Sequence, residues 1–427
     1  MELVAAGSHF AHGRRVVHRD VKPENNHESS LPPLRLLCTF VLSGAVLSCS
    51  GTTIAMGPQT VVLFATPKII SDFANPEVGV TRFLDHYEPL TSRALETIVI
   101  FAVGNSEHIL EYRGKDYWDD GVEWARHTGF PALRPVSDQA LDYHQVEEIV
   151  RAFKSRAVSV GTEFKVFDQI DQGREFAYTD FKANRHPECL AREYEDSYDI
   201  RARLTGDDFV YASAPNGIEE GTLCGDFLAD QVAHYVHDLG FDGILYGNQL
   251  GTRGHWLPEN GPGYSVEEAT AIHDFLEYSQ RVFRDKDLMW FDSYNNVEVE
   301  RQSFSFPTDG YRFFDYLIAS GFSVITSTER YVDNLESKLL LNDRTRVLAT
   351  LDYVDPWYPY NSMIDFPDES ARLEKIAIDY RHQIDGIVFF ANDELGAPVP
   401  RELIESFAER FFGPRCVRCG PTGPLAN

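Results

Sequence analysis

Two aspartates lie in apolar runs near the middle and end of the chain, in a pattern that could support acid–base chemistry. Asp292 belongs to the run DLMWFDSYN (287–295), and Asp352 belongs to RVLATLDYVD (346–355). Because side chains alternate along a strand, Asp292 shares one face with Trp290, and Asp352 shares one face with Leu348. If both faces point into one barrel mouth, the two aspartates project towards each other. Carboxylates that face one another across a cleft can act as a proton donor and as a nucleophile or base. The pair is therefore the first candidate for hydrolysis of a glycosidic bond.

Further polar and aromatic side chains follow the same runs and neighbouring ones. Two more carboxylates, Glu163 and Asp168, are reserve candidates for the acid and the base. Aromatic rings can stack on sugar faces, and amide and lysine side chains can bind hydroxyl groups. The candidates for substrate binding are Lys165, Asn248, Gln249, Trp290, Tyr294, Trp357, Asn392 and Asp393.

Each of these acids also has a structural interpretation. An aspartate at a strand end can cap a helix or shape a turn, as Asp355 before Pro356 would do. Asp242 is expected to bind backbone at the start of its strand, and Glu163 can form an ion pair with Lys165 on the same face. Two hypotheses therefore stay open: a glycoside hydrolase, or a barrel that binds carbohydrate without cleaving it.

Short apolar runs alternate with helical patterns along most of the chain. The runs are rich in Val, Ile, Phe and Tyr, as expected of parallel strands that are covered on both faces. They span 60–66, 96–105, 157–169, 241–249, 287–295, 322–328, 346–355 and 385–393. Eight such runs predict an α/β fold, a single (β/α)8 TIM barrel over residues 58–412, with the site at the C-terminal ends of its strands. An open doubly wound sheet is the alternative, but its Gly-rich phosphate loop is missing after the first run.

Apolar residues at three- and four-residue spacing predict helices between the runs. These helices are expected at 146–157, 225–240, 265–283, 310–321 and 370–383. Gly240 and Gly321 stand where a helix would end, and Ser265 with Glu268 forms a capping box at a helix start.

A family resemblance rests on three stretches in the expected order. FDGI lies near the fourth run, MWFDSYN near the fifth, and FFDYLIASGF follows. The series resembles the barrel of endo-β-N-acetylglucosaminidases and, more distantly, of chitinase-like glycoside hydrolases. The resemblance implies a carbohydrate substrate and places Asp292 in the cleft. That family carries its catalytic glutamate two residues after an asparagine on the fourth strand, whereas Asn248 is followed here by Gln249 and Leu250.

The overall charge excludes one class of partner. The 427 residues carry a formal net charge of −27, with a pI near 4.8. A nucleic-acid phosphate backbone requires a basic surface, so we expect no nucleic-acid partner. We expect a carbohydrate ligand, no cofactor and no transmembrane span. The sequence leaves the oligomeric state open.

The N-terminal residues 1–57 are expected to form a leader outside the barrel. VVHRDVKPEN (16–25) resembles the catalytic loop of protein kinases, with Asp20 as base and Asn25 as metal ligand. Only 17 residues precede His18, and no Asp-Phe-Gly occurs in the chain, so an ATP-binding lobe is missing. A kinase is therefore not expected.

Two short segments bear on localisation and metal binding. Residues 34–49 have the length of a signal-peptide core and end in Ser48-Cys49, faintly like a lipoprotein cleavage site. They predict a secreted or lipid-anchored protein, or a cytoplasmic one if they are not a signal. Cys416 and Cys419 form a lone CxxC in the flexible tail 413–427, and zinc requires four ligands, so no metal is expected.

Overall fold

The computed structural model describes eleven stretches of the chain. They are residues 60–65, 69–101, 143–164, 200–203, 221–246, 263–283, 288–321, 327–341, 345–353, 367–391 and 398–413. The kinase-like string, the segment 34–49 and the CxxC lie outside these stretches. Within them, no helix combines the length and the apolar character needed to cross a membrane.

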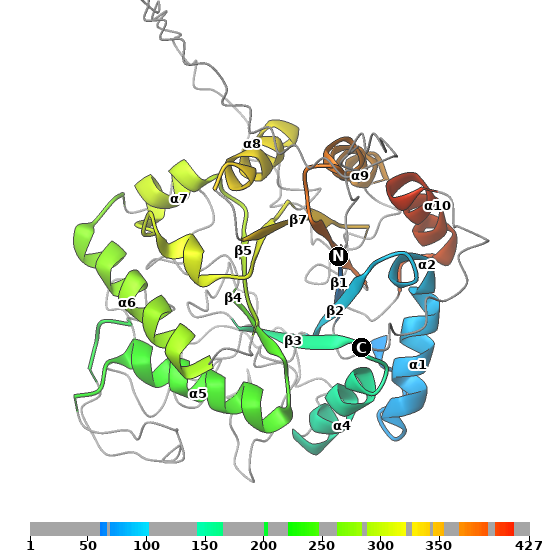
Figure 1. Ribbon diagram of the computed structural model, residues 1–427, viewed down its shortest axis with the longest axis horizontal. Coiled ribbons are helices and arrows are strands. Elements are labelled where there is room, and N and C mark those ends of the chain that lie inside the picture. The colour runs from blue at the N-terminus through cyan, green and yellow to red at the C-terminus, as the bar shows by residue number, and fades with distance from the viewer. Residues whose placement is uncertain are drawn as a thin grey trace, which may run out of the picture. The chain divides into compact units, whose positions relative to one another are not determined.

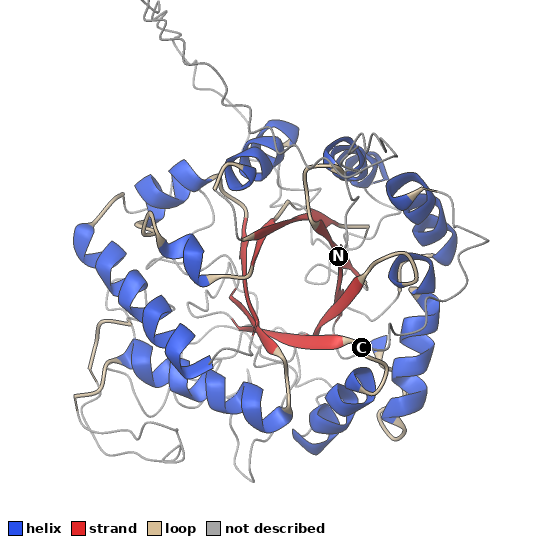
Figure 2. Ribbon diagram, viewed as in Figure 1, coloured by secondary structure: helices blue, strands red, loops and turns tan. Residues whose placement is uncertain are grey.

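Eight parallel strands close into a barrel in chain order (Figure 2). They are β1 (Thr60–Ala65), β2 (Glu96–Phe101), β3 (Ser159–Phe164), β4 (Gly243–Tyr246), β5 (Leu288–Ser293), β6 (Tyr316–Ala319), β7 (Arg346–Leu351) and β8 (Gly386–Phe390). Each strand pairs with the next, and β8 pairs with β1. This confirms the predicted fold class, a (β/α)8 barrel.

Helices surround the strands (Figure 1). They are α1 (Pro76–His86), α2 (Glu88–Thr91), α4 (Tyr143–Lys154), α5 (Cys224–Leu239), α6 (Val266–Phe283), α7 (Val297–Phe304), α8 (Thr328–Leu339), α9 (Pro367–Tyr380) and α10 (Arg401–Phe412), with a 3-10 helix, η5 (Gly310–Phe313). Gly240 ends α5 with φ of 77°, as its position predicted. The Ser265 hydroxyl accepts from the Glu268 amide at 3.3 Å, which confirms the predicted start of α6.

The prediction for the sixth strand was wrong. Residues 310–321 were expected to form a helix and 322–328 a strand, but the strand is β6 and only η5 is helical there. Burial explains the error, because all four residues of β6 are buried and a short, fully apolar run has no alternation to separate strand from helix. Gly321 ends no helix, because it follows β6, and a methyl group there would lie 2.6 Å from the Tyr331 ring.

Contacts between distant strands identify the inward faces. A methyl group added at Gly161 of β3 would lie 2.6 Å from Trp290 of β5 and 2.9 Å from Ile100 of β2. Trp290 in turn stacks on Tyr316 of β6, with ring centroids 6.0 Å apart. Because β3 and β5 are not neighbours, Gly161 and Trp290 can meet only inside the barrel. Positions 163 and 292, two residues further along each strand, belong to the same inward faces.

A second group of inward side chains lies at the N-terminal end of the barrel. Glu96 of β2 accepts from Thr60 of β1 at 3.1 Å, from Tyr316 at 2.7 Å and from Arg346 of β7 at 2.8 Å. Arg346 also lies over the Tyr316 ring at 4.4 Å. This group fixes the inward face of β7 as the one that carries Arg346, Leu348 and Thr350, with Asp352 next in the series.

An aspartate before each of three even-numbered strands binds the strand that precedes it. Asp242 accepts from Val160 N of β3 at 3.0 Å, which confirms the structural role predicted for it. Asp315 accepts from Met289 N of β5 at 2.8 Å, and Asp385 accepts from Val347 N of β7 at 2.8 Å. Each aspartate also donates its own amide to the carbonyl of the residue it binds. These bonds satisfy buried backbone groups where strand pairs begin.

Replacing Gly386 by alanine should destabilise the barrel where it closes. Its added methyl group would lie 2.0 Å from the backbone oxygen of Thr60, which cannot move without breaking the β1–β8 pairing. We expect a loss of about 1–3 kcal/mol or more in the free energy of unfolding, measured by urea denaturation. Gly161→Ala is the matched control and should cost less, because it meets only the side chains of Trp290 and Ile100. Equal stability of Gly386→Ala and the wild type would contradict this account.

Candidate functional site

Two buried carboxylates lie at the C-terminal ends of opposite strands. Glu163 of β3 is 5% exposed, and Asp352, directly after β7, is 2% exposed. Both belong to inward faces, Glu163 with Gly161 and Asp352 with Leu348. The C-terminal end of such a barrel is where catalytic groups are found. The structure therefore brings two of the predicted acids to the same end and face of the barrel.

Asp292 occupies the corresponding place on β5. Its backbone pairs with Ile318 of β6, and alternation puts position 292 on the same face as Trp290. The structure does not describe its side chain. The condition on which the sequence argument rested, that the faces of β5 and β7 point into the barrel, is met. The roles of Asp292 and Asp352 stay predictions.

The two described candidates for sugar binding are both buried. Trp290 has no exposed surface and packs inside the barrel against Gly161 and Tyr316. Tyr294, after β5, is 7% exposed. Stacking of either ring on a sugar stays a prediction. The other candidates, Asp168, Lys165, Asn248, Gln249, Trp357, Asn392 and Asp393, lie outside the described residues.

Outer helices hold the end of β7. Tyr353, next to Asp352, donates to Glu374 Oε2 of α9 at 2.8 Å, and Glu374 forms an ion pair with Arg410 of α10. Burial, followed by the charge of Glu374, raises the pKa of Tyr353 far above its ordinary value. The hydroxyl therefore stays protonated and keeps donating. Tyr331 of α8 donates to the Thr350 carbonyl at 2.7 Å.

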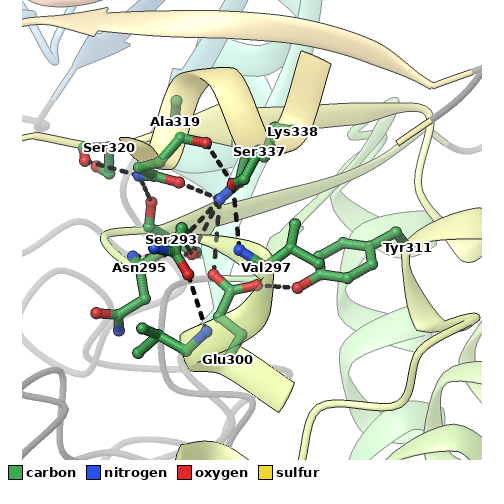
Figure 3. A network of polar contacts seen from close by, with 12 residues as sticks. Ser293, Asn295, Val297, Glu300, Tyr311, Ala319, Ser320, Ser337 and Lys338 are labelled. Atoms are coloured by element: carbon green, nitrogen blue, oxygen red, sulfur yellow. Dashed lines mark hydrogen bonds and ion pairs between the residues drawn. The ribbon is translucent and has the colours of Figure 1, made fainter. Parts of the chain in front are cut away.

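A buried lysine lies behind the end of β5 (Figure 3). Lys338 of α8 has no exposed side-chain surface. Its amino group donates to Ser293 Oγ at 3.2 Å, to the Asn295 carbonyl at 3.0 Å and to Asn334 Oδ1. Glu300 of α7 lies 3.6 Å away as its counter-ion. These partners come from the last residue of β5, from the turn that follows it, and from the helices α7 and α8.

The Glu300 carboxylate is buried between Lys338 and a tyrosine. Tyr311 of η5 donates its hydroxyl to Glu300 Oε2. Burial raises the pKa of Glu300 above 4.5, and the opposing effects of Lys338 and Tyr311 only partly offset it. The pKa of Tyr311 is raised well above 10.0, by burial first and by Glu300 second.

The sequence prediction missed this polar cluster, although a signal for it exists. Arg330, Asn334 and Lys338 follow one another at four-residue spacing and therefore lie on one face of α8. Asn334 donates to the Ser293 carbonyl at 2.7 Å, and Arg330 donates to Asn295 Oδ1 at 2.8 Å. A polar stripe at helical spacing usually indicates solvent exposure. Here Asn334 and Lys338 are buried, which only the packing of α8 against the strand ends determines.

Two other features concern possible modification and metal binding. Cys224, at the start of α5, is buried and disulfide-bonded. On the outer helix α6, His273, Asp274 and Glu277 bring ligand atoms within 4.8 Å of one another. These three side chains are exposed or half-exposed, and such groups are common without a metal. They give no indication of a metal at the strand ends.

No protein-family model matches the chain, and no curated protein matches it significantly. Solved structures with a similar fold include dispersin B, which is 12% identical, over 83% of this chain and 97% of its own, with a TM-score of 0.44. A GH113 beta-1,4-mannanase is 10% identical over 83% and 99% of the two chains, with a TM-score of 0.42. An alpha-amylase from Geobacillus thermoleovorans, complexed with acarbose, is 10% identical over 83% and 78%, with a TM-score of 0.41. At these identities the likeness concerns the fold alone.

Glu300 should make stability depend on pH. A carboxyl group whose pKa is higher in the folded state than in the unfolded state stabilises the fold below its ordinary pKa, and this contribution is lost as the pH rises through the higher value. Relative to Glu300→Gln, the wild type should therefore lose stability from about pH 4.5 upward, by at most about 1.4 kcal/mol per pH unit. Urea unfolding between pH 4.5 and 8 measures the difference. The exposed Glu402→Gln is the control and should follow the wild type, and a constant offset for Glu300→Gln would contradict the prediction.

Proposed function

We propose that the chain hydrolyses glycosidic bonds at the C-terminal end of its barrel. Asp292 and Asp352 are the proposed acid and the base or nucleophile, with Glu163 and Asp168 in reserve. The observation that carries the proposal is the burial of Glu163 and Asp352 on inward faces at one end of the barrel, with position 292 on the inward face of β5. No cofactor is required for this chemistry.

Two carboxyl groups are sufficient for the reaction. One protonates the leaving oxygen, and the other attacks the anomeric carbon or activates a water molecule. Burial suits the acid, because removal from water favours the neutral, protonated form of a carboxyl group. The separation of the two carboxyl groups determines the outcome: about 5 Å gives retention and about 6.5–9.5 Å gives inversion of configuration.

Charge and composition favour a neutral or cationic glycan as substrate. A net charge of −27 disfavours anionic polymers through repulsion. The stretches FDGI and MWFDSYN support the same class, because they resemble glycosidase barrels that act on N-acetylglucosamine linkages.

The second hypothesis is a barrel that binds carbohydrate without cleaving it. The residues after Asn248, which are Gln249 and Leu250, supply no acid where the resembling family has its catalytic glutamate. This hypothesis predicts heat of binding in calorimetry with an oligosaccharide, and no release of reducing ends from any polysaccharide. Hydrolysis by the purified wild type excludes it.

Substitution of Asp292 or Asp352 by asparagine tests the assignment. The test measures reducing ends released from a panel of neutral polysaccharides and 4-nitrophenol released from 4-nitrophenyl glycosides. Each variant should lose about 100-fold or more in kcat, because asparagine can neither donate nor accept the transferred proton. Asp292→Asn should leave the melting temperature nearly unchanged. The exposed Asp333→Asn on α8 is the control and should keep wild-type activity. Full activity of Asp292→Asn would remove Asp292 from the mechanism.

We also propose that the protein is exported, either secreted or lipid-anchored. The disulfide at Cys224 supports this, because disulfides persist in oxidising compartments, and residues 34–49 have the character of a signal segment. In protein isolated from its native cells, Cys224 should resist maleimide labelling under denaturing conditions until a reductant is added. Peptide mass spectrometry identifies the residue. A free Cys224 thiol and recovery of the protein from the cytosol would contradict the proposal.

A further inference from the structure

The last residue of β5 and the turn that follows it are bound to one face of α8. Ser293 accepts from Asn334 and Lys338, and Asn295 accepts from Lys338 and Arg330. Two residues further on, the Val297 amide donates to the Ser337 hydroxyl of α8 at 3.1 Å. Ser293 is the last residue of β5 and directly follows Asp292, so α8 determines where the C-terminal end of β5 lies.

Asn334 also connects the turn to the neighbouring strand. Its amide group donates to the Ser293 carbonyl at 2.7 Å and to the Ser320 carbonyl, directly after β6, at 3.1 Å. The Ser320 amide donates to the Ser293 carbonyl at 2.9 Å. The ends of β5 and β6 are therefore held by a single side chain, and Lys338 holds that side chain in turn through its bond to Asn334 Oδ1.

A buried ion pair is a poor source of net stability, because taking two charges out of water offsets their attraction. Apolar side chains of similar volume would fill the space beside Ser293 at least as well. What Lys338 supplies in addition is direction, because its amino group donates to three acceptors, Ser293 Oγ, the Asn295 carbonyl and Asn334 Oδ1, while Glu300 is its counter-ion. The pair therefore acts on the geometry of the turn more than on the stability of the fold.

We propose that Lys338, held by Glu300, is a positioning residue that fixes the C-terminal end of β5 and with it the carboxylate of Asp292. The inference rests on the proposed function, in which Asp292 is one of the two catalytic carboxylates. A catalytic carboxylate must be held to within about half an ångström, and a misplacement of about 1 Å can cost about 100-fold in rate.

The central experiment compares Lys338→Met with the double variant Lys338→Met, Glu300→Gln. The single variant leaves Glu300 buried without its counter-ion, so its melting temperature should fall. The double variant removes that charge and should regain much of the melting temperature. If Lys338 positions the turn, kcat on the glycan identified in the substrate panel should stay about 10- to 100-fold low in both variants, with KM changed less than threefold. Recovery of kcat together with the melting temperature would show a purely structural role and overturn the proposal.

Glu96→Gln is the matched control. Glu96 also binds a tyrosine hydroxyl and a cation, Tyr316 and Arg346, but at the opposite end of the barrel. This variant should lower the melting temperature and leave kcat within twofold of the wild type. A loss of kcat as large as that of Lys338→Met would mean that any loss of stability impairs the site, and it would also overturn the proposal.

Hydrogen exchange gives a readout that does not depend on activity. Amides of residues 293–297 should exchange faster in both Lys338 variants than in the wild type or in Glu96→Gln. If the wild type hydrolyses no glycan, the proposed function fails, while faster exchange at 293–297 still supports the positioning of the turn. Unchanged exchange in this segment overturns the inference whether or not the protein is a hydrolase.

Discussion

Pairing of β8 with β1 closes the barrel, and the position of every strand end depends on this contact. Gly386 allows it, because the backbone oxygen of Thr60 occupies the space where any other residue would carry its Cβ. Once the ring is closed, its interior must be filled, and Trp290 fills the space left by Gly161. The carboxyl groups of Glu163 and Asp352 lie beyond this packed layer, towards the C-terminal end. The inward carboxylate at the other end, Glu96, is bound by Thr60, Tyr316 and Arg346.

The barrel alone does not fix the residues that follow its strands. The end of β7 is held by a tyrosine, Tyr353, which binds Glu374 on an outer helix. The end of β5 is held by α8 through Asn334 and Lys338. The hydrogen bonds between neighbouring strands end at the last residue of each strand. Beyond that point, in both places, a polar side chain of an outer helix binds the chain instead. The outer helices therefore define the site as much as the strands do.

The barrel could be predicted from the sequence because parallel strands covered on both faces give continuous apolar runs. Seven of the eight runs overlap strands, whereas the sixth failed because Tyr316–Ala319 is too short and too apolar to show a period. Alternation predicted which residues of β5 and β7 share a face, and the contacts of Trp290 and Arg346 identify those faces as the inward ones. The buried pair of Lys338 and Glu300 could not be predicted, since two charged residues on amphipathic helices normally face solvent. The kinase-like string shows the converse limit, because Asp20 and Asn25 predict chemistry only together with the other motifs of a kinase, and the sequence contains no Asp-Phe-Gly.

The aspartates before the even-numbered strands divide the barrel in a way that the ring of eight does not show. Asp242, Asp315 and Asp385 each bind the preceding odd-numbered strand through both side chain and backbone, and Glu96 binds β1 through Thr60. Each pair, from β1 with β2 to β7 with β8, thus has additional bonds at its N-terminal end. At this end the barrel is therefore a fourfold repeat of strand pairs, in which the first strand of each pair is bound by an acidic residue at the start of the second.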